Sequence, residues 1–227
     1  MHPHRKYGNK FFILLFFMTA FGYNLFMRDF ALDIITKSIQ FFFIMTPFFA
    51  LSMFLTLTNG MEKSFQRKLA LKITLSIIII NLIILFFGHL IFSIFGITVD
   101  AFRIGAGALL FLTAVQLNSG KISSISINPD EDISVVPFSI PIIIGPATIG
   151  TLLVESAAMS SFEKVATNVA AELIACVLIG ILLLTANFLE KILGKRGINI
   201  LTKLTALILA ALSAQMIFTG MRGLLLG

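Results

Sequence analysis

The chain contains 227 residues, of which 58% are hydrophobic and only 12% are charged, and its formal net charge is +6. Soluble domains carry about twice this share of charged residues, and a soluble core of this length cannot cover so much apolar surface. The composition therefore excludes a soluble protein and predicts a polytopic membrane protein. Cys176 is the only cysteine, which excludes an internal disulfide bond.

Seven apolar stretches have roughly the 17–25 residues that a helix needs to cross a bilayer. Because these runs are continuously apolar rather than alternating, they exclude a transmembrane β-barrel and predict an all-α bundle of transmembrane helices. The stretches lie near residues 11–27, 36–57, 72–95, 102–118, 134–158, 166–188 and 199–219.

The first 30 residues combine a basic start with the first apolar run. A signal peptide begins in the same way, but no clean small-residue cleavage site follows this run. We expect residues 1–30 to form an uncleaved signal-anchor helix, and a removed signal segment is the alternative.

Lysine and arginine are shared unequally between the segments that connect the apolar stretches. When these segments are assigned alternately to the two sides of the membrane, 12 of the 17 basic residues fall on the side of Lys63, Arg67 and Lys68. The more basic side of a membrane protein is the cytoplasmic one. This distribution predicts a multi-pass protein of the cell inner membrane with a cytoplasmic N-terminus and an external C-terminus, and it explains the positive charge without a nucleic-acid partner.

An internal repeat relates the two halves of the chain. A shift of 99 residues places Pro47 on Pro146 and Gln116 on Gln215. Each half holds three predicted helices, and an odd number of spans inserts the second copy upside down relative to the first. We therefore predict a first repeat at 31–120, a cytoplasmic loop at 121–133 and an inverted second repeat at 134–227.

The two equivalent prolines interrupt the first helix of each repeat. Proline lacks an N–H and clashes with the carbonyl four residues before it, so Pro47 and Pro146 are expected to free the carbonyls of Phe43 and Ile142. Such backbone is tolerated within a membrane only where protein or a hydrated cavity surrounds it. A new half-helix begins after each proline, and its unpaired N–H groups suit a carboxylate.

Both breaks are predicted near the bilayer midplane, where two facing half-helix ends would form a hydrated binding site for a small zwitterion. The alternative is that the prolines only kink the helices. The residues predicted to bind substrate are Thr46, Pro47, Ser52, Gly145, Pro146, Thr148 and Thr151.

Four further polar residues are candidates for the pathway or for coupling. Glu172 is predicted about six residues into its helix, where an acid binds a substrate ammonium group or a proton, or only reaches toward water. Asn81 is predicted at mid-helix, where it lines the pathway or forms a helix–helix hydrogen bond. Gln116 and Gln215 are predicted at opposite depths, as packing contacts or gates.

Other residues are assigned structural roles. Glu155 and Arg103 are predicted at the membrane interface, and Gly105 and Gly107 are predicted to permit close helix packing. The apolar stretches do not supply the clustered ligands that a metal site needs or a nucleophile with a positioned base. We therefore expect no enzymatic activity, no catalytic residue, no metal and no cofactor.

The sequence resembles the MarC family of integral membrane proteins from about Ala31 to Gly223. The resemblance rests on "TPFFALSMFLTLTNG", "FGITVDAFRIGAGALLFLTAVQ", "VVPFSIPIIIGPATIGT" and "LSAQMIFTG". The family pattern has Asn-Pro where this chain has Thr46-Pro47, and it often has a further proline where this chain has Ser52. The resemblance implies a transporter of neutral amino acids such as glycine and alanine.

Taken together, these features predict a secondary transporter or exporter of small neutral amino acids. One three-helix unit is expected to rock against the other around the paired breaks, giving alternating access. The expected partners are a small-molecule substrate, the lipid bilayer, and a proton or cation for coupling. The alternative is a channel-like or regulatory multi-pass membrane protein in which the breaks only shape the packing.

Overall fold

The computed structural model describes residues 28–119 and 143–226. The predicted signal-anchor helix, apart from its last residues, and the predicted loop at 121–133 lie outside the described residues. The described elements are helices: Arg28–Ile44, α2 (Pro47–Leu57), α3 (Lys63–Phe95), α4 (Val99–Ser119), α5 (Pro146–Ala158), α6 (Phe162–Leu184) and α7 (Ala186–Leu226).

Within the described ranges, four helices are long and apolar enough to cross a membrane, namely α4, α6, α7 and the first part of α3. The helix Arg28–Ile44 and α2 meet at an angle of 45° and together make up a fifth candidate span. These spans confirm the prediction of an all-α polytopic membrane protein.

Two helices extend beyond their predicted bounds. α3 begins at Lys63 rather than near residue 72, because the charged residues of its first turns stay exposed while Gln66 and Leu69 are buried. α7 begins at Ala186 rather than near residue 199, and it bends at Gly194, whose φ of 62° is readily adopted only by glycine. Charge keeps a segment out of hydrocarbon but not out of a helix, which explains both differences.

In the α3 helix, buried and exposed apolar residues lie on different faces. Residues four apart lie on one side of a helix. One such stripe is buried and consists of Ile73, Ile77, Asn81 and Leu85, whereas another is exposed and consists of Leu71, Leu75, Ile79 and Ile83. The exposed stripe is therefore the side of α3 suited to contact lipid.

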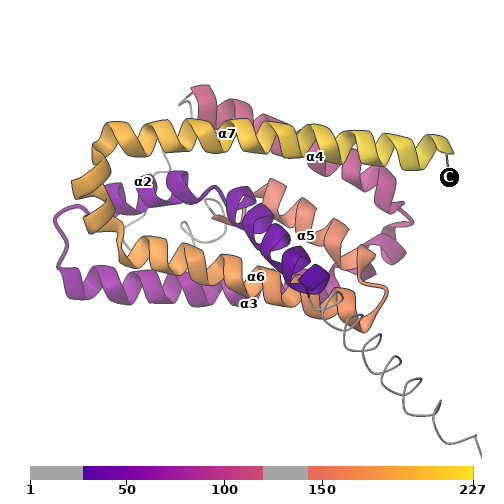
Figure 1. Ribbon diagram of the computed structural model, residues 1–227, viewed down its shortest axis with the longest axis horizontal. Helices are drawn as coiled ribbons and strands as arrows, with labels where there is room; N and C mark the ends of the chain where they lie inside the picture. Colours follow the sequence, from indigo (N-terminus) through magenta and orange to yellow (C-terminus); the bar gives the residue numbers. More distant parts are fainter. Residues whose placement is uncertain (1–27, 120–142, 227) are drawn as a thin grey trace, which may run out of the picture.

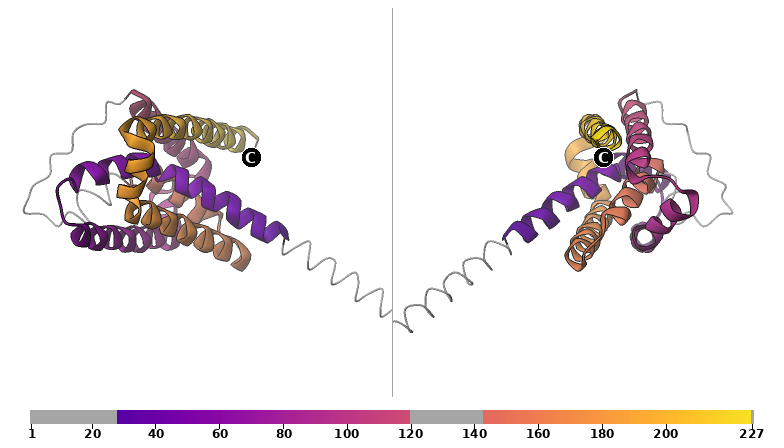
Figure 2. Two further views of the ribbon diagram at one scale, coloured as in Figure 1. Left: turned by 60° about the vertical axis from the view of Figure 1, so that its left-hand side comes forward. Right: turned by 90° about the vertical axis from the view of Figure 1, so that its right-hand side faces the viewer.

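The helices form three layers (Figure 1 and Figure 2). α4 and α7 make one outer layer, α3 and α6 make the other, and the bent helix pair and α5 lie between them. In agreement with this arrangement, α2 packs against α7 and α6, and α5 packs against α4 and α3. Each outer layer shares its own apolar core with the middle layer, one around Phe54 and Ile179 and one around Leu110 and Leu209.

The helix pairs that touch can be compared under the exchange of halves that the predicted repeat implies. Exchange of the two halves maps α2, α3 and α4 onto α5, α6 and α7. Under this exchange the α2–α7 contact corresponds to α4–α5, and the α3–α5 contact to α2–α6, while α3–α6 and α4–α7 each map onto themselves. The extensive contacts between these labelled helices join one repeat to the other, and the α6–α7 contact within the second repeat is slight.

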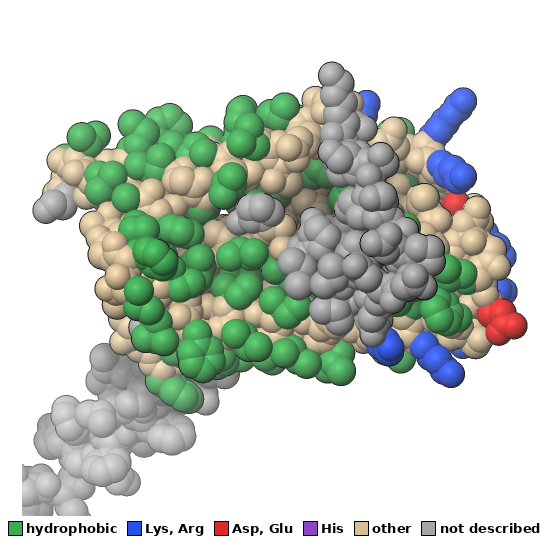
Figure 3. All heavy atoms as spheres, turned by 180° about the vertical axis from the view of Figure 1, so that it is seen from behind, with side chains coloured by type: hydrophobic (Ala, Val, Ile, Leu, Met, Phe, Trp, Pro, Cys, Tyr) green, Lys and Arg blue, Asp and Glu red, His purple; other side chains and the backbone are tan. Residues whose placement is uncertain are grey.

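Basic side chains gather at one end of the bundle (Figure 3). This end, called the basic end below, holds the α2–α3 connection and the junction of α6 with α7. Its exposed basic residues are Lys63, Arg67, Lys68, Lys191, Lys195 and Arg196. The opposite end holds the α3–α4 and α5–α6 connections and the last turns of α7.

Only one of the two glycines predicted to permit close packing does so. A Cβ atom at Gly107 would lie 2.7 Å from Ile217 Cγ1 and 3.1 Å from the backbone oxygen of Ser213, so α4 and α7 approach closely there. A Cβ atom at Gly105 would meet nothing within 4 Å. The prediction for Gly105 is wrong because this residue lies on the exposed side of α4.

Candidate functional site

The first break lies at Thr46, between the helix Arg28–Ile44 and α2. Thr46 has φ 51° and ψ 57°, in the left-handed region that a β-branched residue rarely adopts, and Pro47 is the first residue of α2. The Thr46 N–H donates to the carbonyl of Phe43 at 3.0 Å. The prediction that this carbonyl is free is therefore wrong, because a tightened last turn supplies a donor before the proline.

The second break lies at Gly145, immediately before α5. Gly145 is extended, with φ −74° and ψ 173°, and Pro146 is the first residue of α5. A Cβ atom at Gly145 would meet nothing within 4 Å, so space is open beside this residue. The predicted free carbonyl at Ile142 lies outside the described residues.

Both half-helices start their hydrogen-bond ladder at equivalent residues. The Ala50 N–H donates to the Thr46 carbonyl and the Ile149 N–H donates to the Gly145 carbonyl, each at 3.0 Å. The amides that precede these bonds have no place in the ladder of their own helix, and they carry the positive end of its dipole. These amides belong to Phe48 and Phe49 in α2 and to Ala147 and Thr148 in α5.

The two breaks lie against each other in the middle layer. The Thr148 hydroxyl is 3.0 Å from the Ile143 carbonyl in its own break and 3.4 Å from the Ile44 carbonyl in the other. Thr46 and Thr148 are only 5% and 3% exposed. Two of the predicted site residues are thus brought together at a buried crossing point.

A cavity of about 160 Å³, called the opposite-end cavity below, begins beside this crossing. It extends from Ile44 along the sides of α5 and α7 toward the end of the bundle away from the basic residues. Its polar lining residues are Gln40, Arg103, Thr151, Glu155, Gln215 and Thr219. Arg103 also donates to Asp100 at 2.7 Å, so its charge is already partly neutralised.

A second cavity of about 210 Å³, called the basic-end cavity below, lies on the other side of the crossing. Its lining includes Asn59, Glu190, Lys195 and Ile198, together with three residues of α2. Those three, Ser52, Leu55 and Thr56, are related by the 99-residue repeat to Thr151, Val154 and Glu155 of the opposite-end cavity. The two cavities therefore share the repeat-related faces of α2 and α5 and lie toward opposite ends of the bundle, whereas their other lining residues are not related by the repeat.

The predicted single chamber is thus divided. Ser52 and Thr151, which were expected to share one chamber, line two separate cavities, and the buried crossing point lies between them. Gln215 lines the opposite-end cavity, whereas its equivalent Gln116 is exposed on α4 and lines neither cavity.

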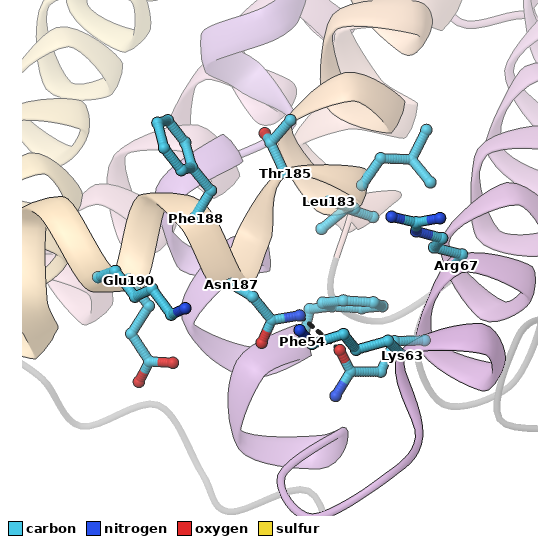
Figure 4. Close-up of a pocket in the computed structure, with 11 residues that line it drawn as sticks. Phe54, Lys63, Arg67, Leu183, Thr185, Asn187, Phe188 and Glu190 are labelled. Carbon is cyan, nitrogen blue, oxygen red and sulfur yellow. Dashed lines mark hydrogen bonds between the residues drawn. The ribbon is translucent and has the colours of Figure 1, made fainter.

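A larger cavity of about 410 Å³ adjoins the basic-end cavity, because Glu190 lines both. Lys63 and Arg67 of α3 lie on one side of it, and Asn187 and Glu190 of α7 lie on the other (Figure 4). The buried Gln66 donates to the carbonyls of Thr58 and Met61 and accepts from Asn187. These bonds tie the α2–α3 connection to the start of α7.

Glu172 and Asn81 meet between α3 and α6. Asn81 Nδ2 donates to Glu172 Oε1 at 2.6 Å, and both side chains are fully buried. α6 begins at Phe162, so Glu172 lies ten residues along a helix of 23 residues, about 15 Å from its start. Glu172 is therefore deeper than predicted, and the helix–helix hydrogen bond considered for Asn81 has Glu172 as its acceptor.

Two residues that were not singled out from the sequence join Glu155. Lys37 Nζ donates at 2.8 Å to Glu155 Oε2 and at 2.8 Å to Asn168 Oδ1. The Lys37 and Glu155 side chains are each 24% exposed, and Asn168 is buried. No local pattern in the sequence indicates Lys37. Asn168 lies four residues before Glu172 on the same face of α6, and this spacing could have been recognised in the sequence.

Comparison with known protein families agrees with an all-α membrane protein. A family model described as "MarC family integral membrane protein" matches residues 31–225. The chain belongs to the MarC family. This membership confirms the family resemblance found in the sequence and the multi-pass membrane character of the chain.

Several MarC-family relatives match over most of their length. The UPF0056 membrane protein YvbG of Bacillus subtilis is 34% identical over 195 residues, which cover 82% of this chain and 92% of the relative. YhcE of Escherichia coli is 31% identical over 198 residues, with 83% and 92% covered. A relative from Aquifex aeolicus is 28% identical over 207 residues, with 88% and 97% covered. No solved structure matches the chain.

Proposed function

We propose that this MarC-family protein is a secondary transporter of small neutral amino acids such as glycine and alanine, in the cell inner membrane. One observation carries the proposal: two cavities, lined by repeat-related faces of α2 and α5, lie toward opposite ends and are separated by the crossing of two proline-initiated half-helices. Alternating access requires a barrier between the two sides of the membrane, and this crossing would supply it. The amino-acid class rests on the family resemblance.

The polar groups of the cavities suit a zwitterion. The opposite-end cavity has the carboxylate of Glu155 and the guanidinium of Arg103, and the basic-end cavity has Glu190 and Lys195. The amide N–H groups at the start of α2 and α5 would donate hydrogen bonds to a carboxylate bound at the crossing. The opposite-end cavity has a volume of about 160 Å³, so we propose a small substrate for it.

The packing favours a different rigid-body movement from the rocking of one repeat against the other that the sequence predicts. Rocking one repeat against the other would separate α4 from α7, which form the most extensive helix contact. We therefore assign the movement to the outer layers, with the α4–α7 pair shifting relative to the α3–α6 pair around the bent middle helices. The basic end faces the cytoplasm in this proposal, and the C-terminus lies outside.

Uptake of radiolabelled glycine or alanine into proteoliposomes, with and without a pH gradient, tests the proposal. Saturable uptake by the full chain is expected. Pro146→Ala restores a backbone donor at the start of α5, so we expect uptake to fall about tenfold or more, with a smaller loss of expression. Pro3→Ala, far from either break in the sequence, is the control for the substitution itself.

The outcomes separate the candidate functions. Unchanged uptake in Pro146→Ala would contradict the placement of the site at the breaks. Ion current without saturable uptake would favour a channel, and neither activity would favour a regulatory membrane protein.

A further inference from the structure

Three buried side chains form a polar stripe along one face of α6. Asn168, Glu172 and Cys176 are spaced four residues apart, so they stack along the helix at intervals of about 6 Å. All three are buried, in a helix whose remaining core-facing residues are mostly apolar. Buried polar groups in a membrane helix carry a free-energy penalty unless they are paired, and they commonly mark a functional path.

The middle of this stripe is incompletely hydrogen-bonded. Glu172 Oε1 accepts from Asn81 Nδ2 at 2.6 Å and from the Cys176 thiol at 3.4 Å. Within residues 28–119 and 143–226, Glu172 Oε2 and Asn81 Oδ1 have no hydrogen-bond partner, although both atoms are buried. One unpaired oxygen belongs to each member of the same pair.

A single proton on Glu172 Oε2 would supply the hydrogen-bond donor that these two atoms lack. A protonated carboxyl can donate from Oε2 to an amide oxygen while its Oε1 accepts from the amide N–H, which gives a two-bond acid–amide pair. An ionised carboxylate has no donor for the Asn81 oxygen, and it would be buried without a cationic partner. The surroundings of Glu172 therefore fit the neutral acid.

The stripe leads from Glu172 toward the partly exposed ion pair of Lys37 and Glu155. Asn168, one turn before Glu172, accepts from Lys37, and Lys37 also pairs with Glu155. Lys37 belongs to the helix before the first break, whereas Glu155 and Asn168 belong to α5 and α6. Movement of that helix away from both α5 and α6 would break the two Lys37 contacts and would admit water to the stripe.

We propose that Glu172 is a proton-binding carboxyl, and that the Lys37–Glu155–Asn168 cluster controls its access to the end of the bundle opposite the basic end. Hydronium on that side gives up a proton to the Glu172 carboxylate, so that one O–H bond of hydronium breaks, an O–H bond forms at Oε2 and water is left, and the reverse step returns the proton to water. The role of this proton in driving transport rests on the function proposed above, but proton binding itself does not.

Few other ionisable groups face this site. Cys176 is the titratable side chain in direct contact with Glu172, and the charged groups beside the stripe are Lys37 and Glu155. α2 has no charged residue, the lysines and the arginine of α3 lie in its first turns toward the basic end, and the histidine of α3, His89, lies eight residues beyond Asn81. The charges of α7 lie in its first half and at Arg222 near its end.

Infrared spectroscopy of the full chain tests proton binding without a substrate. With ¹³C-labelled glutamate, a protonated glutamic-acid carbonyl band that shifts with the label is expected at neutral pH. Glu172→Gln, which keeps the size and the contact with Asn81, should remove this band, whereas Glu163→Gln at the exposed start of α6 should leave it. Absence of the band in the parent protein, or its persistence in Glu172→Gln, would overturn the proposal.

Hydrogen–deuterium exchange tests the access route. Lys37→Met removes both contacts of the cluster, so the carbonyl band should shift in D₂O about tenfold faster or more, while Lys37→Arg should exchange at a rate close to that of the parent. Equal rates in Lys37→Met and the parent would show that the cluster does not control access.

Transport assays separate this inference from the proposed function. In Glu172→Gln we expect exchange of internal for external glycine to continue, but the uptake driven by a pH gradient to fall about tenfold or more. Full gradient-driven uptake in that variant overturns the coupling role of Glu172. A parent protein that takes up no amino acid overturns the proposed function and leaves the infrared result standing.

Discussion

At the first break Thr46 is held at a positive φ of 51°, whereas at the second break Gly145 is simply extended. Both breaks are followed by a proline and start their half-helix at the same position of the repeat. Their surroundings differ, since Phe48 and Phe49 follow the first proline where Ala147 and Thr148 follow the second.

This difference shows that the repeat keeps the interruption but not the way in which the chain makes it. The first break combines a strained backbone with bulky apolar side chains. The second combines a relaxed backbone with open space at Gly145 and a hydroxyl at Thr148. If the breaks bind substrate, the second one offers the more open backbone, and substitutions at the two breaks should have different effects.

The largest expected effect on stability is at Thr148. Thr148→Val removes the hydroxyl that lies within hydrogen-bond distance of the carbonyls of both breaks, so we expect the free energy of unfolding to fall by about 1–3 kcal/mol. Thermal unfolding of the detergent-solubilised protein measures this change. The control is Thr113→Val, which removes a hydroxyl that is hydrogen-bonded within α4 and should change the free energy of unfolding by less than about 0.5 kcal/mol. Equal losses in the two variants would argue against a joining role for Thr148.

A smaller effect of opposite sign is expected at Thr46. Asparagine adopts the left-handed conformation more readily than a β-branched residue does, so Thr46→Asn should raise the free energy of unfolding by about 1 kcal/mol. In a chain of this length the midpoint of thermal unfolding should rise by about 2–4 °C. Thr56→Asn, on the exposed side of α2, is the control, and a lower midpoint in Thr46→Asn would show that the threonine is not strained.

The smallest effect on stability is expected at Gly145. Its φ of −74° is open to any residue and a Cβ atom there meets nothing within 4 Å, so Gly145→Ala should change the free energy of unfolding by less than about 0.5 kcal/mol. If substrate approaches this backbone, the added methyl should still raise the apparent KM for uptake. Gly107→Ala, where a Cβ collides with Ile217, should be the less stable protein. Unchanged KM in Gly145→Ala would exclude close approach at this residue.

The breaks could be predicted from sequence because proline removes a backbone donor wherever it stands. Their offset of 99 residues also revealed the repeat. The depth of Glu172 was misjudged because its helix was counted from the apolar run near residue 166. The helix begins earlier, after Ser161, whose hydroxyl caps it by accepting from the Lys164 N–H.

Contacts between distant residues left no such pattern. Lys37 meets Glu155 and Asn168 across 118 and 131 residues of chain, and no local pattern indicates that Lys37 pairs with either of them. The division of the expected chamber into two cavities likewise depends on how closely the half-helices cross. That closeness is set by side-chain packing in three dimensions, to which a single sequence gives no direct access.

The packing of helices from one repeat against helices from the other has a consequence for biosynthesis. Since α2 packs on α7 and α3 packs on α6, helices made early are matched with helices made late. The first half of a nascent chain therefore reaches the bilayer before its neighbours exist, and it has to remain there as loosely associated helices until translation is complete. The two halves then dock like the subunits of a dimer that happen to share one polypeptide.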